Sequence, residues 1–357
     1  MSIPGVNDIG RTGQNLTEQT LTPGNVNSTS FGRLFGIAVD GQVNAQPLYV
    51  SGVQIPGRGT HNVLYVATEH DTVYALDADN RDGQNATPLW QASMLDPSRG
   101  AAPGATTEAS ADASQVDIVP EIGITGTPVI DANAGTIYLI AKSWENNAVV
   151  QRLHALDITT GAERTNSPVL IQASVPGTGN GSVDGVLNLD PRWAHNRPGS
   201  LLLNGVLYAG FGSHGDNGPW HGWILSYDAS TLTQRGVYCP TPNGIGSGFW
   251  MSGAGLAADV IDPNGQPFGR MFVATGNGSF NARPPFTQDR NFSDDVLHLD
   301  LANGRPTVVD SFTPFSEAEI NWSDEDVGAG GVLVLPDQPG GHPHLLVEVG
   351  KQGATAS

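Results

Sequence analysis

One pattern of strands recurs along the chain and constrains its fold more than any other feature. Each copy contains an apolar strand, a turn, a second strand with an aromatic residue, a loop, and a third strand that ends in aspartate. The aromatic residues are Tyr65, Tyr138, Tyr208 and Phe272, and the strand-ending aspartates are Asp77, Asp157, Asp228 and Asp300. A period of roughly 65–80 residues that carries four strands is typical of one β-propeller blade with long loops.

A four-stranded sheet of this kind is apolar on both faces, so it must pack between two neighbouring sheets. The strand-ending aspartate has a local purpose, because its carboxylate can accept hydrogen bonds from the N–H groups of the following turn. We therefore interpret these aspartates as structural. A fifth copy begins at residues 331–335 and 344–347. The sequence predicts an all-β fold, a β-propeller of four-stranded blades with about five blades in this chain.

The first copy reads Tyr65-Val66-Ala67-Thr68, then Val73-Tyr74-Ala75-Leu76-Asp77, and closes with Leu89-Trp90. In these residues it resembles the repeat of pyrroloquinoline-quinone (PQQ)-like β-propellers. That family includes quinoprotein alcohol dehydrogenases and non-catalytic outer-membrane assembly lipoproteins. The resemblance extends over residues 33–350 and implies the fold. It leaves the activity open.

The ends of the chain raise the question of how the ring closes. We expect an extended N-terminal segment over residues 1–32 and a single propeller domain over residues 33–357. Residues 33–40 resemble an outer strand that completes the last blade and so removes open sheet edges. The alternative is a truncated larger propeller, whose exposed apolar blade faces would favour a homo-oligomer.

The net charge of −19 limits the classes of partner. A surface this acidic repels phosphate backbones and anionic lipids, which argues against nucleic-acid binding and membrane insertion. No apolar run approaches the ~20 residues that a membrane span needs. Cys239 is the only cysteine, so neither an internal disulfide nor a cysteine metal cluster can form. We expect an extracytoplasmic protein, periplasmic or secreted, although Met1–Pro4 leads into polar sequence and not into a signal peptide.

Long loops between the repeat strands hold most of the histidine, tryptophan and acidic residues. Long loops on a rigid scaffold are where function tends to lie. Propeller symmetry turns these loops towards a common central mouth. There we expect His70, His195, His214 and His221 to bind a divalent metal, either zinc, manganese or calcium. The alternative for each histidine is an ordinary hydrogen-bonding or stacking role.

A metal at this mouth predicts a hydrolase of ester-like substrates. The ion lowers the pKa of a bound water, and a loop carboxylate or histidine acts as the base. The candidate catalytic residues are Glu121, His195 and Asp216, and Arg197 could hold an anionic group of a small-molecule or polymer substrate. The arginine could equally be a surface ion-pair partner.

Two other functions stay open. The resemblance implies a quinone-dependent oxidoreductase, in which a quinone lies between a tryptophan and a pair of adjacent cysteines, beside a calcium ion. Trp250 and Trp220 are then the cofactor-binding residues, and Glu121 and Asp326 the candidate calcium ligands. Because Cys239 stands alone, we do not expect PQQ. The third possibility is a non-catalytic binding or scaffold propeller.

Overall fold

The computed structural model describes residues 2–3, 8–15, 18–80, 82–83, 86–113, 117–251, 253–259, 269–353 and 355–356. Within these ranges the fold is all-β, as predicted, and the α-helix is α1 (Glu317–Ser323). Short 3-10 helices span Pro97–Arg99, Ala302–Gly304 and Val327–Ala329. No helix in the described part of the chain is long and apolar enough to cross a membrane.

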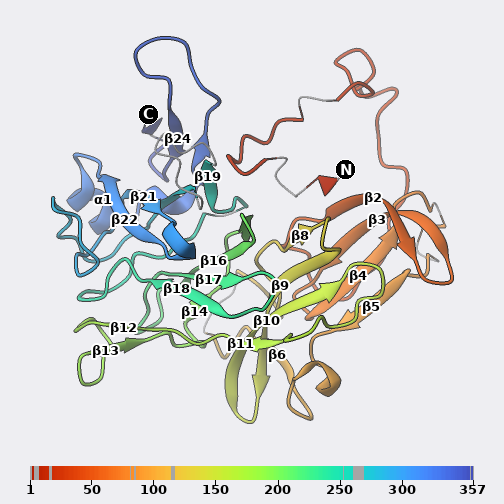
Figure 1. Cartoon of the computed structure of the whole chain (residues 1–357), viewed down its shortest axis with the longest axis horizontal. Helices are drawn as coiled ribbons and strands as arrows, with labels where there is room; N and C mark the ends of the chain where they lie inside the picture. The colour runs from red at the N-terminus through yellow and green to blue at the C-terminus, as the bar shows by residue number, and fades with distance from the viewer. Residues whose placement is uncertain are drawn as a thin grey trace.

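The strands form antiparallel sheets that follow one another around an arc in chain order (Figure 1). The first sheet contains β1 (Ser2–Ile3), β2 (Leu48–Ile55), β3 (Gly59–Ala67), β4 (Thr72–Asp77) and β5 (Trp90–Ser93). The second contains β6 (Thr106–Ala109), β7 (Glu121–Ile122), β8 (Val129–Asp131), β9 (Thr136–Glu145), β10 (Ala148–Asp157) and β11 (Val169–Leu170). A separate hairpin contains β12 (Ser174–Pro176) and β13 (Val186–Asn188).

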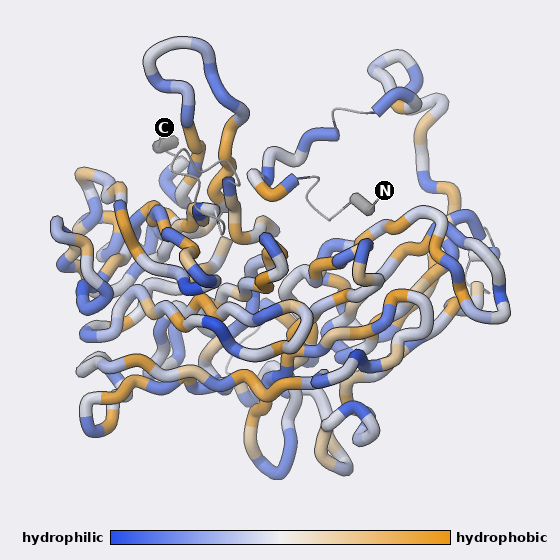
Figure 2. Tube along the Cα trace, viewed as in Figure 1, coloured by the Kyte–Doolittle hydropathy of each residue, from blue (hydrophilic) through white to orange (hydrophobic). Residues whose placement is uncertain are grey.

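The remaining sheets continue the same arrangement. The third contains β14 (Ala194–His195), β15 (Leu201–Leu203), β16 (Val206–Ser213), β17 (Trp223–Asp228) and β18 (Gln234–Tyr238). The fourth contains β19 (Ala257–Asp259), β20 (Arg270–Ala274), β21 (Val296–Asp300) and β22 (Thr307–Phe312). The fifth contains β23 (Leu333–Val334), β24 (Leu346–Val349) and β25 (Thr355–Ala356). Hydrophobic residues recur in every sheet, whereas the long connecting loops are mostly hydrophilic (Figure 2).

The hydrophobic cores lie between neighbouring sheets. In β9, Ile137 and Leu139 belong to the core shared with the first sheet, whereas Tyr138 and Ile140 belong to the core shared with the third. Successive side chains of a strand point to opposite faces, so one strand supplies both cores. Further cores join the third sheet to the fourth and the fourth to the fifth. Each inner sheet is therefore buried on both faces, as the propeller prediction requires.

The repeated aspartates have the predicted structural role. In each case Oδ1 accepts a hydrogen bond from the backbone N–H two residues later: Asp77 from Asp79 at 3.0 Å, Asp157 from Thr159 at 2.7 Å, Asp228 from Ser230 at 3.0 Å and Asp300 from Ala302 at 3.1 Å. These bonds fix the turn that leads towards the outer strand of each sheet.

Two of the three repeated tyrosines, Tyr65 and Tyr138, connect neighbouring sheets. The Tyr65 hydroxyl donates to the carbonyl of Ile158 at 2.8 Å, and the Tyr138 hydroxyl donates to the carbonyl of Ala229 at 2.9 Å. Each acceptor directly follows the strand-ending aspartate of the next sheet along the chain. The two repeated features of the sequence thus meet at the boundary between sheets.

The N-terminal part of the chain differs from the prediction. Residues 33–40 form no strand; Ile37 and Val39 instead pack against a small cluster that contains Val66, Tyr74 and Leu76 of the first sheet. The N-terminal strand is β1, and it pairs with β2 of the first sheet. The predicted outer strand at 33–40 that completes the last blade is therefore wrong. The alternating apolar residues of this segment pack their side chains against the first sheet, but their backbone pairs with no strand.

Residues 9–11 lie against the third, fourth and fifth sheets. The carbonyl of Ile9 accepts from the N–H of Ala258 at 2.8 Å, and the carbonyl of Gly10 accepts from the N–H of Val334 at 2.8 Å. The Arg11 guanidinium donates to the carbonyls of Leu256 at 3.0 Å and Ser200 at 3.1 Å. Burial lowers the pKa of Arg11 to about 10, against the opposing effect of Asp8.

A pair of tyrosine variants tests the bonds between sheets. Tyr138→Phe removes the hydroxyl that donates to Ala229, and the free energy of unfolding should fall by about 1 kcal/mol. Tyr208→Phe is the matched control, because the Tyr208 hydroxyl is buried without a hydrogen-bond partner in the described part of the chain. We expect this control to be nearly neutral. Urea unfolding followed by circular dichroism measures both, and equal losses would contradict the proposed role.

Candidate functional site

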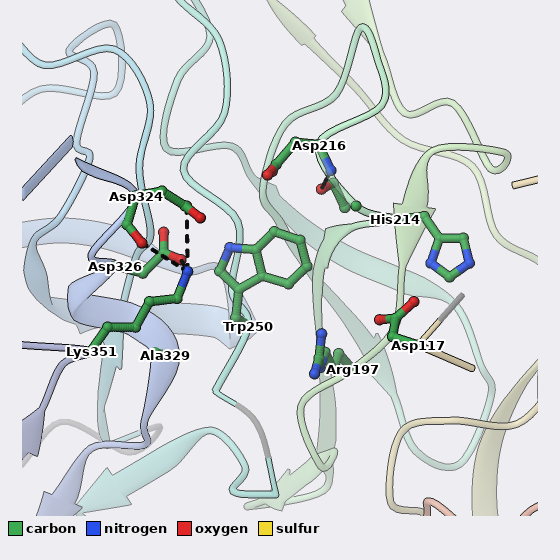
Figure 3. Close-up of a pocket in the computed structure, with 11 residues that line it drawn as sticks. Asp117, Arg197, His214, Asp216, Trp250, Asp324, Asp326, Ala329 and Lys351 are labelled. Carbon is green, nitrogen blue, oxygen red and sulfur yellow. Dashed lines mark hydrogen bonds and ion pairs between the residues drawn. The ribbon is translucent and has the colours of Figure 1, made fainter. Parts of the chain in front are cut away.

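A cavity of about 200 Å³ lies where loops from several sheets meet. Its lining residues come both from loops that lead into a sheet and from loops between the second and third strands of a sheet: Asp117, Arg197, Ser213, His214, Gly215, Asp216, Trp250, Asp324, Asp326, Ala329 and Lys351. The two kinds of loop therefore share one mouth, as expected. Figure 3 shows Trp250 between two groups of polar side chains.

One side of the cavity is a lysine held by two aspartates. Lys351 Nζ lies 2.6 Å from Asp326 Oδ2 and 3.3 Å from Asp324 Oδ1. Partial burial lowers the pKa of Lys351, but the two carboxylates outweigh burial and raise it overall. Asp326 Oδ1 also accepts the backbone N–H of Asn277 at 2.7 Å. The ammonium group therefore occupies the space between the two carboxylates.

Trp250 forms the wall between the two groups and is packed against glycines. A Cβ on Gly276 would lie 2.8 Å from Trp250 Nε1, and one on Gly212 would lie 3.0 Å from the indole ring. Any larger residue at these positions would displace the ring. Trp220 meets the Trp250 ring edge-on, with ring centroids 5.8 Å apart. The guanidinium carbon of Arg197 lies 5.7 Å from the Trp250 ring centroid, which is within cation–π range.

The other side of the cavity contains a stacked pair of histidines. The rings of His195 and His214 are 4.7 Å apart and nearly parallel, and each residue is 2% exposed. Burial lowers the pKa of His214 to about 4, with contributions from the cations Lys142 and Arg197. Burial also lowers the pKa of His195, and the charges of His214 and Lys142 lower it further. Both imidazoles are therefore neutral near pH 7.

Both histidines have a nitrogen that the fold leaves unused. Nε2 of His195 and Nε2 of His214 are buried and have no hydrogen-bond partner among the described residues. A buried polar atom without a partner costs free energy unless something supplies the missing bond. Since His214 lines the cavity, a ligand could supply this bond there.

A buried ion pair lies close enough to influence both histidines. Lys142 Nζ is 2.8 Å from Glu108 Oε2, and both side chains are almost fully buried. The ammonium also donates to the carbonyl of Arg192 at 3.0 Å. Its positive charge disfavours protonation of both imidazoles. Lys142 thus helps to keep the histidine pair neutral.

The other predicted site residues lie outside the cavity lining. His70 Nδ1 contacts Glu121 Oε2 at 2.8 Å, and the same carboxylate oxygen accepts from Thr107 Oγ1 at 2.7 Å. His221 binds Thr241 through Nδ1 at 3.1 Å and the carbonyl of Asn180 through Nε2 at 2.8 Å. Both ring nitrogens of His221 are therefore occupied, whereas His70 is paired through Nδ1 with a carboxylate outside the cavity lining.

The predicted four-histidine metal site is therefore not assembled. Within the described ranges, no group of three or more histidine, cysteine, aspartate or glutamate side chains is arranged to hold a metal ion. The predicted calcium ligands are also divided, because Asp326 lines the cavity and Glu121 does not. Of the predicted site residues, the cavity brings together Arg197, His214, Asp216 and Trp250, with His195 and Trp220 directly behind them.

Sequence reasoning missed Lys351 as a site residue. The residues around it lose the repeat pattern, so they gave no reason to expect a functional loop. One signal was present: Lys351 is one of only two lysines in the chain, and it lies two residues after the strand β24, in a loop equivalent to the one that carries His214.

No protein-family model matches the sequence, and no curated protein matches it. The structure is similar to a quinohemoprotein alcohol dehydrogenase from Pseudomonas putida HK5, with a TM-score of 0.52 and 17% identity over 88% of this chain and 40% of that one. It is also similar to the quinohemoprotein alcohol dehydrogenase from Comamonas testosteroni, with a TM-score of 0.51 and 17% identity over 87% and 40%. The chain spans about two fifths of their length. At this identity the likeness shows the propeller fold.

These matches correct the expectation about the cofactor. PQQ was not expected because Cys239 has no partner cysteine. Both matched proteins are quinohemoproteins, so that expectation is wrong: the fold is one in which a quinone is held. A metal-assisted hydrolase, by contrast, is supported neither by the positions of the histidines nor by these matches.

Asp294 and Asp295 are adjacent buried carboxyl groups, and Asp294 supports the loop that carries Asp324 and Asp326. Asp294 Oδ1 accepts the N–H of Val327 at 3.1 Å. Burial raises the pKa of Asp294 to about 7 and that of Asp295 to about 8, and Glu317 adds to both shifts. The folded state therefore holds these protons more tightly than the unfolded chain, in which an aspartate has a pKa of about 3.9. Their contribution to stability is complete below about pH 4 and is lost as the pH rises towards 8.

The variant Asp295→Asn tests this pH dependence, because asparagine is a neutral group of similar shape. The free energy of unfolding should fall less between about pH 5 and pH 8 than in the wild type. Urea unfolding at several pH values measures the slope. Asp184→Asn, at an exposed turn, is the control and should keep the wild-type slope. An unchanged slope in Asp295→Asn would show that this carboxyl group is not the one that titrates.

Proposed function

We propose that this chain is the propeller of a quinone-dependent oxidoreductase, and that its cofactor and an alcohol substrate bind in the cavity beside Trp250. The observation that carries the proposal is the combination of a tryptophan wall, Arg197 over the same ring, and the unused Nε2 of His214 in one cavity. The shared fold with quinohemoprotein alcohol dehydrogenases supports it.

The residues present fit a planar, anionic cofactor such as PQQ. Trp250 offers an indole surface for stacking, and its Nε1 is a buried donor without an acceptor among the described residues. Arg197 forms no ion pair in the described part of the chain, so its guanidinium is available to a carboxylate. Lys351, at the opposite side of the cavity, is already paired with Asp324 and Asp326 (Figure 3).

The acidic residues of the cavity define where the cofactor's carboxylates can lie. Asp326 is neutralised by Lys351, whereas Asp117 and Asp216 form no ion pair in the described ranges. The carboxylates of a bound quinone would therefore lie towards Arg197, the cation of the cavity lining that has no ion-pair partner in the described ranges. The pKa of Asp216 is raised by partial burial and by Asp324 and Asp326.

When bound, PQQ would supply the oxidant, taking up the two electrons and two protons that an alcohol loses as it becomes a carbonyl compound. His214 accepts the hydroxyl proton at Nε2, which has no partner in the fold. A neutral imidazole is required for this role, and burial together with Lys142 provides it. His195 stacks on the His214 ring and holds it in position.

Cofactor binding can be tested without catalysis. We expect PQQ to quench the tryptophan fluorescence of the purified protein saturably. Trp250→Leu should weaken binding strongly, whereas Trp250→Phe retains an aromatic surface and should weaken it less. Arg197→Ala removes a charge-assisted contact worth roughly 1.5–3 kcal/mol, equivalent to a loss of about 10- to 100-fold in affinity. Trp322→Leu, outside the cavity lining, is the control and should bind as the wild type does.

Turnover is tested by dye reduction with a series of primary and secondary alcohols. His214→Ala should lower kcat by about 10²–10⁴-fold and leave the dissociation constant of PQQ almost unchanged, because the histidine acts on the substrate proton. If the wild type binds PQQ but oxidises no alcohol, a binding role replaces the oxidoreductase. If PQQ does not bind at all, the proposal fails.

A further inference from the structure

Aromatic side chains that do not line the cavity are exposed on and around α1. Trp322 is 91% exposed, Phe315 is fully exposed, and Phe312 at the end of β22 is 53% exposed. Large apolar side chains are common in cores and rare as exposed clusters on a protein surface. Figure 1 places α1 beside β21 and β22 at the periphery of the fourth sheet. An exposed aromatic cluster at this place indicates an interaction surface.

The helix that carries Trp322 is held firmly in place. Ile320 is buried in the core between the fourth and fifth sheets. The Asn321 side chain makes two hydrogen bonds with the backbone of Gly278, at 2.7 and 3.0 Å. These contacts fix which side of α1 faces the protein. The outward position of Trp322 is therefore a consequence of the fold and not of a frayed helix end.

The charged side chains between Arg305 and Lys351 are all acidic. No lysine or arginine stands between Arg305 and Lys351. The same stretch contains only acidic charged residues: Asp310, Glu317, Glu319, Asp324, Glu325, Asp326, Asp337 and Glu348. Of these, Asp310 and Glu319 are exposed beside the aromatic residues. A partner that meets this surface faces apolar rings surrounded by negative charge.

We propose that Phe312, Phe315 and Trp322, together with Asp310 and Glu319, form a docking surface for a basic protein, and we name it the aromatic–acidic face. Aromatic side chains are enriched among the residues that contribute most binding energy in protein interfaces. The surrounding carboxylates favour a positively charged partner and increase its association rate. The same charges repel nucleic acids and anionic membranes. This proposal does not depend on the quinone proposal.

The experiment titrates the full chain with lysozyme, a small basic protein, at low salt and measures the dissociation constant by calorimetry. We expect saturable binding that weakens as salt is added. The double variant Phe315→Ala/Trp322→Ala should weaken binding at least tenfold, and Glu319→Gln several-fold. Because both aromatic side chains are exposed, the double variant should keep its fold, which circular dichroism verifies.

Matched controls separate this face from the general acidity of the chain. Leu170→Ala removes an apolar side chain that is 47% exposed on the second sheet, and Asp184→Asn removes one exposed charge elsewhere. Both should bind lysozyme as the wild type does. Succinylated lysozyme, whose amines have become acids, should not bind. Absence of saturable binding, equal binding by the double variant, or binding of succinylated lysozyme overturns the proposal.

Discussion

Burial of each sheet between two neighbours is the constraint on which the rest of this structure depends. A strand such as β9 places Ile137 and Leu139 towards one neighbour and Tyr138 and Ile140 towards the other. No inner sheet could keep either face in water, so the sheets must follow one another around an axis. The tyrosine hydroxyls that bind the carbonyls of Ile158 and Ala229 then set how neighbouring sheets are aligned.

The same stacking creates the cavity. Equivalent loops of successive sheets converge, although their residues are as far apart in sequence as Asp117 and Lys351. The cavity combines an aromatic wall, Arg197 beside the indole ring, the neutral imidazole of His214 and four aspartates, two of which are paired with Lys351. Burial and the nearby Lys142 keep His214 unprotonated, so the scaffold determines the chemistry of its loops as well as their positions.

The sequence predicted the parts of this structure that repeat. The aromatic and aspartate positions recur with the sheets, and the aspartates accept the turn N–H groups that the pattern predicted. Of the four predicted histidines, His214 lines the cavity and His195 stacks on it, whereas the partners that hold His70 and His221 elsewhere could not be predicted. His70 pairs with Glu121 and His221 with Thr241, and such contacts depend on side-chain geometry that no spacing encodes. Residues 33–40 show the same limit, because alternation of apolar residues does not distinguish backbone pairing from side-chain packing.

The contacts of residues 9–11 have a consequence for the order of assembly. Arg11 donates to the carbonyl of Leu256, which lies 245 residues further along the chain, and Gly10 binds Val334 beyond that. During synthesis this short segment leaves the ribosome long before its partners exist. The first sheets can pack against one another as they are synthesised, since their cores join sheets that are consecutive in sequence. The contacts of residues 9–11 with the third to fifth sheets can form only after those sheets have been synthesised. A segment that is synthesised early is thus among the last to form its native contacts.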